Sequence, residues 1–231
     1  MKLIIGCDEA PHRSARAGAK RRKPVAKQDG FIKQRILIGV DEAGRGAWAG
    51  PLVAAAVCLK NEKKFKHPLI KDSKKLSPQQ RQEVFIYLQP ICKIGIGVVE
   101  VGEINEWGLQ KANVVAVERA LIEVRRKKKG VGEILIDHIG GFKNYTTLKE
   151  NYSLHKFGES KYQEIAAASI VAKVSRDQMM CKLHKKFPHY GFAEHKGYGT
   201  QQHLTALKKY GVTPLHRLKF QPIIRLRELV E

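Results

Sequence analysis

The segment Ile38-Gly39-Val40-Asp41-Glu42-Ala43-Gly44-Arg45-Gly46 carries an apolar run, two acidic residues and a glycine-flanked arginine in direct succession. The apolar run Ile36–Val40 is short and dominated by branched aliphatic residues, which predicts a buried strand. Asp41 and Glu42 stand where this strand is expected to end, and Gly44-Arg45-Gly46 predicts a loop after it. Because active groups in open α/β sheets gather beyond strand ends, this segment predicts both a strand of the sheet and one part of a functional site.

Predicted strands and helices alternate from residue 36 to the end of the chain. Short apolar runs predict strands at residues 36–40, 52–59, 94–99, 133–137 and, more weakly, 152–157. Helical spacing of apolar residues predicts helices at residues 78–88, 102–127, 161–184 and 201–210. Ser77-Pro78-Gln79-Gln80 has the residues of a capped helix start, and Thr200 is expected to cap the last helix. The alternation predicts an α/β fold, a mixed sheet flanked by helices, with a C-terminal helical region.

Residues 1–35 differ from the rest of the chain in composition. They contain ten Lys or Arg residues against three acidic ones, and they show no helical or strand period. We interpret them as a basic, mostly disordered N-terminal extension that precedes one folded domain at residues 36–231. Leu3–Ala10 in this extension echoes Leu37–Ala43 but lacks the glycine-flanked arginine, so we assign it no part in the site.

The charge of the chain is strongly unbalanced. Among 231 residues, 43 Lys and Arg outweigh 22 Asp and Glu, which gives a formal net charge of +21. A surplus of this size points to a polyanionic partner, most often nucleic acid. The hydrophobic content of 43% is that of an ordinary globular protein.

Membrane and secreted classes are not favoured by the sequence. No apolar run approaches the roughly 18 residues of a membrane-spanning helix, and Met1–Cys7 is too short for the apolar part of a secretory signal. The four cysteines are scattered without a Cys-x-x-Cys pair, so a disulfide framework is not expected. We therefore expect a soluble, reduced, cytoplasmic protein, and nothing in the sequence demands more than a monomer.

Asp137 ends a second predicted strand, so its carboxylate is expected to meet those of Asp41 and Glu42. Acids brought together repel and raise one another's pKa unless a cation lies between them. Oxygen ligands without a supporting Cys or His pair suit Mg²⁺ or Mn²⁺, and two such ions about 3.5–4 Å apart promote hydrolysis of a phosphodiester. An acidic hard-metal site in a basic chain predicts a nuclease.

A simpler interpretation of Asp41 and Glu42 has about equal support from spacing alone, because acids at strand ends are common turn residues. A pleated strand also directs neighbouring side chains to opposite faces. If both residues bind metal, the strand must end or twist between them, or Glu42 must contribute its backbone carbonyl.

The segment around Asp41, followed by Gly50-Pro51, resembles the opening signature of type II ribonuclease H, or ribonuclease HII. Four further stretches and the tail agree in the same order over residues 36–220. They are Asp72–Leu76, Leu135–Asp137, Ala167–Asp177, Phe187–Thr200 and His216–Phe220. Five motifs in a fixed order argue strongly against chance agreement.

The resemblance implies the ribonuclease H fold and an endonuclease activity. Members of the family cut the RNA strand of RNA–DNA hybrids and nick duplex DNA on the 5′ side of a single embedded ribonucleotide. Hydrolysis leaves a 3′-hydroxyl and a 5′-phosphate. The expected partners are therefore RNA–DNA hybrids and ribonucleotide-containing DNA, and the expected role is the repair of misincorporated ribonucleotides.

The resemblance also implies a two-metal site for Mg²⁺ or Mn²⁺ held by four acids. By position, Asp41, Glu42 and Asp137 are the first three, and Glu159 stands where the family usually has aspartate. Glutamate is one methylene longer, so the second metal is expected to shift or to be held through water. Asp177 is the rival fourth acid, but it matches a helix residue of the family and is expected to make structural hydrogen bonds.

Gly44, Arg45, Gly46 and Tyr198 are the substrate-binding residues that the resemblance implies. Glycines let the backbone approach a sugar–phosphate closely, and exposed N–H groups cradle phosphates. In the family this loop and tyrosine read the ribose 2′-hydroxyl at the RNA–DNA junction, whereas Tyr198 alone would be interpreted as a half-buried aromatic. Arg45 indicates type II, because the type III relatives carry lysine there and have a longer folded N-terminal domain.

Two other functions stay open at this point. A basic nucleic-acid-binding protein that has lost catalysis is favoured by Glu159 and by the duplicated acidic stretch in the extension. A binding module for RNA alone would show no preference for hybrids over RNA duplex.

The remaining signals are weaker. A zinc site among Cys181, His184, His189 and His195 is not favoured, since no second ligand pair has standard spacing. The basic residues of two segments predict either phosphate contacts or solvated helix ends, and both tryptophans are expected to pack. These residues are Lys74, Lys75, Arg125–Lys129, Trp48 and Trp107.

Overall fold

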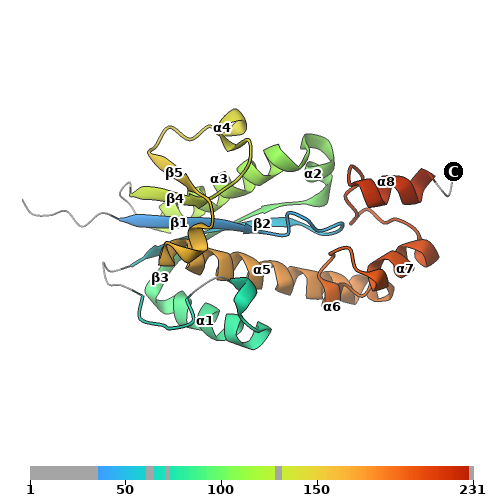
Figure 1. Ribbon diagram of the computed structural model, residues 1–231, viewed down its shortest axis with the longest axis horizontal. Coiled ribbons are helices and arrows are strands. Elements are labelled where there is room, and N and C mark those ends of the chain that lie inside the picture. The colour runs from blue at the N-terminus through green and yellow to red at the C-terminus, as the bar shows by residue number, and fades with distance from the viewer. Residues whose placement is uncertain (1–35, 61–64, 71–72, 128–131, 229–231) are drawn as a thin grey trace, which may run out of the picture. The chain divides into compact units, whose positions relative to one another are not determined.

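A five-stranded mixed sheet stands at the centre of the computed structural model, which describes residues 36–60, 65–70, 73–127 and 132–228 (Figure 1). Its strand order is β3-β2-β1-β4-β5. The strands are β1 (Leu37–Ala43), β2 (Leu52–Leu59), β3 (Cys92–Val99), β4 (Glu133–Asp137) and β5 (Tyr152–His155). All five predicted strands are confirmed, and β2 and β4 have the predicted bounds.

The pairing of β1 decides where the acidic residues meet. β1 runs antiparallel to β2 and parallel to β4, with Val40 opposite Ile136. Parallel neighbours end at the same edge of a sheet. Asp41 and Asp137 therefore follow a paired position on adjacent strands and lie side by side.

Eight α-helices complete the described part of the chain, together with three short 3-10 helices. The α-helices are α1 (Pro78–Ile91), α2 (Val101–Trp107), α3 (Leu109–Lys127), α4 (Phe142–Tyr145), α5 (Gln163–Lys186), α6 (Phe192–His195), α7 (Gln201–Tyr210) and α8 (Gln221–Glu228). The 3-10 helices are η1 (Ser73–Lys75), η2 (Gly158–Ser160) and η3 (Pro188–Tyr190). The predicted capping of α1 is confirmed, since Ser77 and Gln80 form a capping box, and Thr200 Oγ1 accepts from the His203 N–H at the start of α7.

The single helix predicted over residues 102–127 is wrong. Gly108 interrupts it with a φ of 79°, a backbone conformation that glycine adopts without a Cβ penalty. The chain turns there, so α2 and α3 are separate helices. The helical spacing of apolar residues continues from α2 into α3, so this spacing did not predict the turn at Gly108.

Two helical layers cover the two faces of the sheet (Figure 1). α3 packs on one face with α2 and α4, while α5 and α1 pack on the other. α5 lies unusually close to β1, because a Cβ added at Gly39 would stand 2.0 Å from the backbone carbon of Glu164. Glycine at this position, and the alanines that follow in α5, let the N-terminal turns of the helix pack directly against the strand.

The C-terminal helices form a third buried cluster with Tyr190 and Phe192 beyond one end of the sheet (Figure 1). His195 stacks on His203 with ring centroids 4.5 Å apart, and His203 Nε2 lies 3.1 Å from His216 Nε2. Burial lowers the pKa of His203 and of His216 to about 4, so both rings are neutral at pH 7. The predicted C-terminal helical region is confirmed.

Some predictions fall outside the described residues. These are the basic extension over residues 1–35 with its domain boundary, Asp72, Lys128 and Lys129. In the part of the chain that the structure describes, no helix is both long enough and apolar enough to cross a membrane.

Candidate active site

Asp41 and Glu42 lie inside β1, which continues to Ala43 opposite Val53 of β2. The prediction that the strand ends before them is wrong, because antiparallel pairing with β2 carries the strand two residues further. Their side chains therefore point to opposite faces of the sheet, as the pleat requires. Asp41 faces α5, and Glu42 faces α3.

Asp41 is a buried acid with 7% of its surface exposed. Its Oδ1 accepts a hydrogen bond of 2.7 Å from the Glu42 N–H, and Ser169 of α5 supplies a side-chain hydrogen bond. Burial, followed by repulsion from Glu42 and Asp137, nevertheless raises the pKa of Asp41 well above its ordinary value. A buried carboxyl under this strain is a group that a cation would stabilise in its charged form.

Glu42 occupies a second buried environment against Asn113 of α3. Burial raises the pKa of Glu42, while Arg45 and Asn113 act to lower it. Its Oε2 has no hydrogen-bond partner among the described residues, and neither does the amide nitrogen or oxygen of Asn113 in well-aligned geometry. Asn113 was missed by sequence reasoning, although a polar residue at a core position of an amphipathic helix was a usable signal.

Asp137 and Glu159 are linked through the backbone of η2. The Gly158 N–H donates to Asp137 Oδ1 at 2.9 Å, which brings η2 against the end of β4. The side chain of Glu159 is 9% exposed, and its Oε1 lies 4.0 Å from Lys74 Nζ. Glu159 Oε2 is buried without a hydrogen-bond partner in the described part of the protein.

One pocket of about 360 Å³ collects seven of the eight predicted site residues. It is lined by Asp41, Glu42, Asp137, Gly44, Arg45, Gly46 and Tyr198, together with Ser73, Lys74, Arg81, His138, Ser169 and Lys173. Glu159 is absent from this lining and approaches the pocket through Lys74.

Asp41, Glu42 and Asp137 line the same pocket, but their side chains are not arranged as a complete set of metal ligands. Among residues 36–60, 65–70, 73–127 and 132–228, no group of three or more acidic, histidine or cysteine side chains is arranged to hold a metal ion. The side chains of Asp41 and Glu42 point to opposite faces of β1, so their carboxylates do not converge on one point. The three pocket carboxylates still suit a hard divalent cation, because they offer oxygen ligands and Glu42 Oε2 is buried without a partner among the described residues.

The loop after β1 is held by two buried arginines. Arg217 is fully buried and donates to the carbonyls of Gly44 at 2.7 Å, Arg45 at 3.1 Å and Gly50 at 2.8 Å. Arg176 of α5 donates to the carbonyls of Pro51 at 2.9 Å, Ala49 at 3.1 Å and Lys196 at 2.9 Å. Neither arginine was predicted to have a role, although each lies within a motif that the sequence analysis singled out.

Tyr198 closes the other side of the pocket. Its ring lies 5.6 Å from Lys173 Nζ and 5.3 Å from the guanidinium carbon of Arg176. These cations hold the ring beside the loop. Lys173 also donates to Asp177 Oδ1 at 2.8 Å, so the expectation that Asp177 makes a structural hydrogen bond is confirmed.

The weaker candidates fall elsewhere. Trp48 and Trp107 pack against buried clusters, as predicted. Cys181 is exposed on α5, whereas His195 is buried against His203 in the C-terminal cluster.

A mixed sheet whose central parallel strands bring acids to a loop-lined pocket is the arrangement that the resemblance to ribonuclease H predicts. Residues 38–223 match the family model for ribonuclease HII. The ribonuclease HII of Pseudothermotoga lettingae is 40% identical over 205 residues, covering 88% of this chain and 86% of that protein. The ribonuclease HII of Magnetococcus marinus is 40% identical over 195 residues, covering 83% and 87%. The chain belongs to the ribonuclease HII family and is a ribonuclease H endonuclease.

Solved structures agree with this fold. The ribonuclease H2 of Pyrococcus horikoshii aligns with a TM-score of 0.68 at 26% identity, over 84% of this chain and 98% of that one. Bst-RNase HIII in complex with Mn²⁺ aligns with a TM-score of 0.68 at 20% identity, over 94% and 77%. The predicted ribonuclease H-like mixed sheet flanked by helices is confirmed.

Proposed function

We propose that this chain hydrolyses the RNA strand of RNA–DNA hybrids and nicks duplex DNA 5′ of single embedded ribonucleotides, leaving a 3′-hydroxyl and a 5′-phosphate. The pocket that places Asp41, Glu42 and Asp137 against Gly44–Gly46 and Tyr198 carries this proposal. Acids suit hard cations, and the loop and ring suit a sugar–phosphate. The formal charge of +21 suits a polyanionic substrate. This substrate implies a role in removing ribonucleotides from DNA.

We infer that Asp41, Glu42 and Asp137 hold Mg²⁺ or Mn²⁺, with Glu159 as the fourth acid. Divalent ions at this place would activate a water and stabilise the departing 3′ oxygen. The chain itself fixes the acids: Ser169 orients Asp41, and the Gly158 N–H orients Asp137. Because the side chain of Glu42 points to the opposite face of β1 from that of Asp41, we infer that Glu42 reaches the ion held by Asp41 through its backbone carbonyl. The unpartnered Oε2 atoms of Glu42 and Glu159 are the oxygens that have most to gain from a further cation.

The loop Gly44–Gly46 is suited to reading the junction between ribonucleotide and deoxyribonucleotide. The guanidinium of Arg217 donates hydrogen bonds to the carbonyls of Gly44 and Arg45. With these carbonyls paired, the backbone N–H groups of the loop are the ones suited to contact a phosphate. Arg45 is exposed at the rim, where a guanidinium can pair with a phosphate. Tyr198 lies across the pocket, in a position to stack on the neighbouring sugar.

A pair of glycine variants separates folding from substrate approach in this loop. Gly44 has a φ of 93°, and a Cβ there would stand 1.9 Å from Arg176 Nε, whereas a Cβ at Gly46 would meet nothing within 4 Å. We expect Gly44→Ala to lower the free energy of unfolding by at least about 2 kcal/mol. Gly46→Ala should stay within about 0.5 kcal/mol of the wild type.

Binding supplies the second measurement on this pair. Because Gly46 is exposed in the pocket, its new methyl group would meet the sugar–phosphate, and we expect roughly tenfold weaker binding of a duplex with one ribonucleotide, about 1.4 kcal/mol. Chemical denaturation and fluorescence anisotropy give the two values. Wild-type affinity of Gly46→Ala would remove this loop from the substrate interface.

The test of the proposed function uses a labelled DNA duplex with one ribonucleotide beside a full RNA–DNA hybrid and an RNA duplex. Each is incubated with Mg²⁺, Mn²⁺ or EDTA. We expect a metal-dependent nick 5′ to the ribonucleotide, cleavage of the RNA in the hybrid, and an intact RNA duplex. Product ends are identified by whether a ligase joins them to a 5′-phosphate or 3′-hydroxyl partner.

Glu159 supports one alternative, a nucleic-acid-binding protein of the same fold with impaired catalysis. It is absent from the pocket lining and pairs with Lys74 at 4.0 Å. Tight binding of the hybrid without cleavage in either metal would favour this alternative over the proposed nuclease. Recovery of cleavage by Glu159→Asp would then identify residue 159 as the cause.

A further inference from the structure

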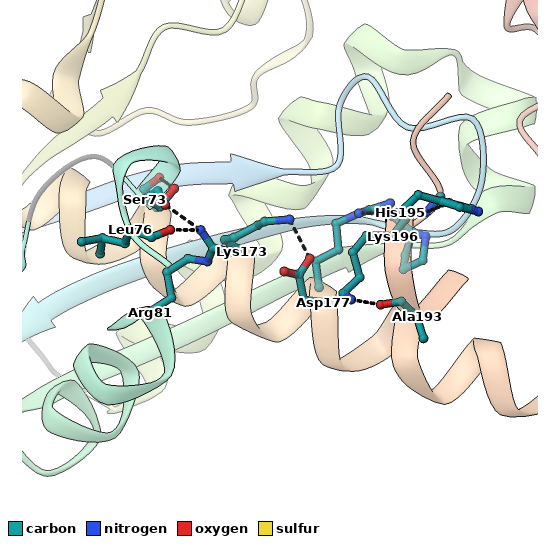
Figure 2. Close-up of polar contacts among 12 residues, drawn as sticks. Ser73, Leu76, Arg81, Lys173, Asp177, Ala193, His195 and Lys196 are labelled. Atoms are coloured by element: carbon teal, nitrogen blue, oxygen red, sulfur yellow. Dashed lines mark hydrogen bonds and ion pairs between the residues drawn. The ribbon is translucent and has the colours of Figure 1, made fainter. Parts of the chain in front are cut away.

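A second cavity, of about 520 Å³, adjoins the active-site pocket and shares Arg81 and Lys173 with it. It lies between the N-terminal end of α1, which carries Arg81, and the part of α5 that carries Lys173 and Asp177 (Figure 2). Its lining also includes Glu194 of α6 and the following Lys196. We call this cavity the α1–α5 groove. It is lined by Pro78, Arg81, Gln82, Lys173, Val174, Asp177, Gln178, Cys181, Lys182, Lys185, Glu194 and Lys196.

The groove is positively charged. Five of its lining residues are lysine or arginine, and two are acidic. Both acids already have polar partners, since Asp177 accepts from Lys173 at 2.8 Å and Glu194 accepts from Gln202 at 3.3 Å. The groove therefore offers a surplus of cations to an anionic ligand.

The cations of the groove differ in how they are held. Arg81 donates to the carbonyls of Ser73 and Leu76, and Lys196 donates to the carbonyl of Ala193, so these side chains are fixed (Figure 2). Lys182 and Lys185 are exposed, and no described residue pairs with either. With Lys173, which is held by Asp177, the groove has three anchored cations and two long lysines that no described residue holds.

The length of α5 along the groove sets how many nucleotides a duplex lying along this helix would pass. Lys182 and Lys185 stand three residues apart, on the face of α5 that carries Gln178 and Cys181 toward the groove. From Lys173 to Lys185 the helix rises about 18 Å, at 1.5 Å per residue. One DNA strand places a phosphate every 3.4 Å along its axis, so this length follows about five nucleotides.

We propose that the α1–α5 groove binds the phosphate backbone of the substrate duplex on one side of the cleaved position, with Lys182 and Lys185 as its outer phosphate contacts. The proposal rests on the proposed function, because it assigns the ligand of the groove from that of the adjoining pocket. It adds a length requirement that the pocket alone does not give. A substrate must extend about five nucleotides beyond the junction on that side to reach both lysines.

The test measures binding in EDTA, where no cleavage intervenes. The variant Lys182→Gln/Lys185→Gln is compared with the control Lys66→Gln/Lys149→Gln, which removes the same charge at two exposed lysines outside the groove. Three duplexes with one ribonucleotide are used. One has about twelve base pairs on both sides of it, and each of the others has only about two on one side.

We expect the groove variant to reduce the slope of log K against log salt by about 2 on the long duplex, and the control to leave it unchanged. One of the two shortened duplexes should lose the difference between variant and wild type. Equal effects of both double variants, or an equal effect on every duplex, would overturn the proposal. Because binding is measured without metal, a failure of cleavage would not be confused with a failure of the groove.

Cys181 provides a readout that does not depend on charge. It is exposed within the groove, while Cys58 and Cys92 are buried, and burial raises the pKa of Cys92 to about 12. In a Cys7→Ser background, the long duplex should slow alkylation of Cys181 at least severalfold, and the duplex shortened on the relevant side should not. Unchanged alkylation of Cys181 at saturating long duplex would contradict the proposal.

Discussion

We expect Asp41→Asn to lower the rate of cleavage at the embedded ribonucleotide at least about a thousandfold, because a lost metal ligand removes several kcal/mol of transition-state stabilisation. Asp41 is the most buried of the pocket acids and is repelled electrostatically by both Glu42 and Asp137. The amide keeps the size and the hydrogen bond to the Glu42 N–H but loses the charge. The rate is measured at saturating Mg²⁺ and again at saturating Mn²⁺.

The same variant should be at least as stable as the wild type without metal. Burial and repulsion raise the pKa of Asp41, so its ionised form costs stability at pH 7, and a neutral amide removes that cost. Added metal should raise the melting temperature of the wild type and have a much smaller effect on Asp41→Asn. A variant that keeps its stability but loses cleavage and metal-induced stabilisation would identify Asp41 as a residue of the active site.

Glu123→Gln is the matched control for this experiment. Glu123 is a partly exposed carboxylate on α3 that pairs with Arg126 and Lys127, outside the pocket lining. Its loss should leave cleavage within about twofold of the wild type, as is usual for a surface ion pair. Cleavage by Asp41→Asn within tenfold of the wild type would refute its assignment as a metal ligand.

The sequence predicted the sheet well because each strand was marked by its own composition. Leu52–Leu59 is apolar throughout, and in the structure it is buried on both faces. β1 was predicted too short because Asp41 and Glu42 read as turn residues, whereas pairing with β2 extends the strand through them. Local polarity therefore predicted the strand end wrongly, while the predicted acids do line one pocket.

The predicted pocket residues meet because β1 and β4 are parallel neighbours and α5 packs closely on β1. Sequence motifs named the acids, the loop and Tyr198, but they could not name what holds them. Asn113 is one such residue, since its role depends on α3 packing over the face of the sheet that carries the Glu42 side chain. Arg217 is another, since it reaches the loop from the opposite end of the chain.

Arg217→Met tests how far the loop depends on that contact. The guanidinium donates to carbonyls of Gly44, Arg45, Gly50 and Pro51, and methionine of similar length would leave most of these acceptors unpaired. We expect the free energy of unfolding to fall by about 3–5 kcal/mol. For a domain of this size the melting temperature should fall by roughly 10 °C, measured by calorimetry.

An opposing effect makes this outcome informative. No acidic side chain among the described residues pairs with Arg217, and burial together with repulsion from Arg176 lowers its pKa to about 9. Replacing it therefore removes the free-energy cost of a buried charge. Buried ion groups replaced by apolar ones are sometimes neutral for this reason. We expect the loss of hydrogen bonds to the carbonyls to outweigh the gain from removing one buried charge, because Arg217 donates to several carbonyls.

Arg217→Lys and Arg225→Met separate the contributions. Lysine keeps the charge, but its single ammonium cannot replace the planar guanidinium that reaches several carbonyls. Arg217→Lys should therefore recover little of the lost free energy of unfolding. Arg225 is exposed on α8, and its replacement should leave stability within about 0.5 kcal/mol. Well below its melting temperature, Arg217→Met should also cleave the embedded ribonucleotide roughly tenfold to a hundredfold more slowly, because the loop no longer holds its geometry. Wild-type stability of Arg217→Met would mean that desolvation of the guanidinium cancels its hydrogen bonds, and that Arg176 alone suffices to hold the loop.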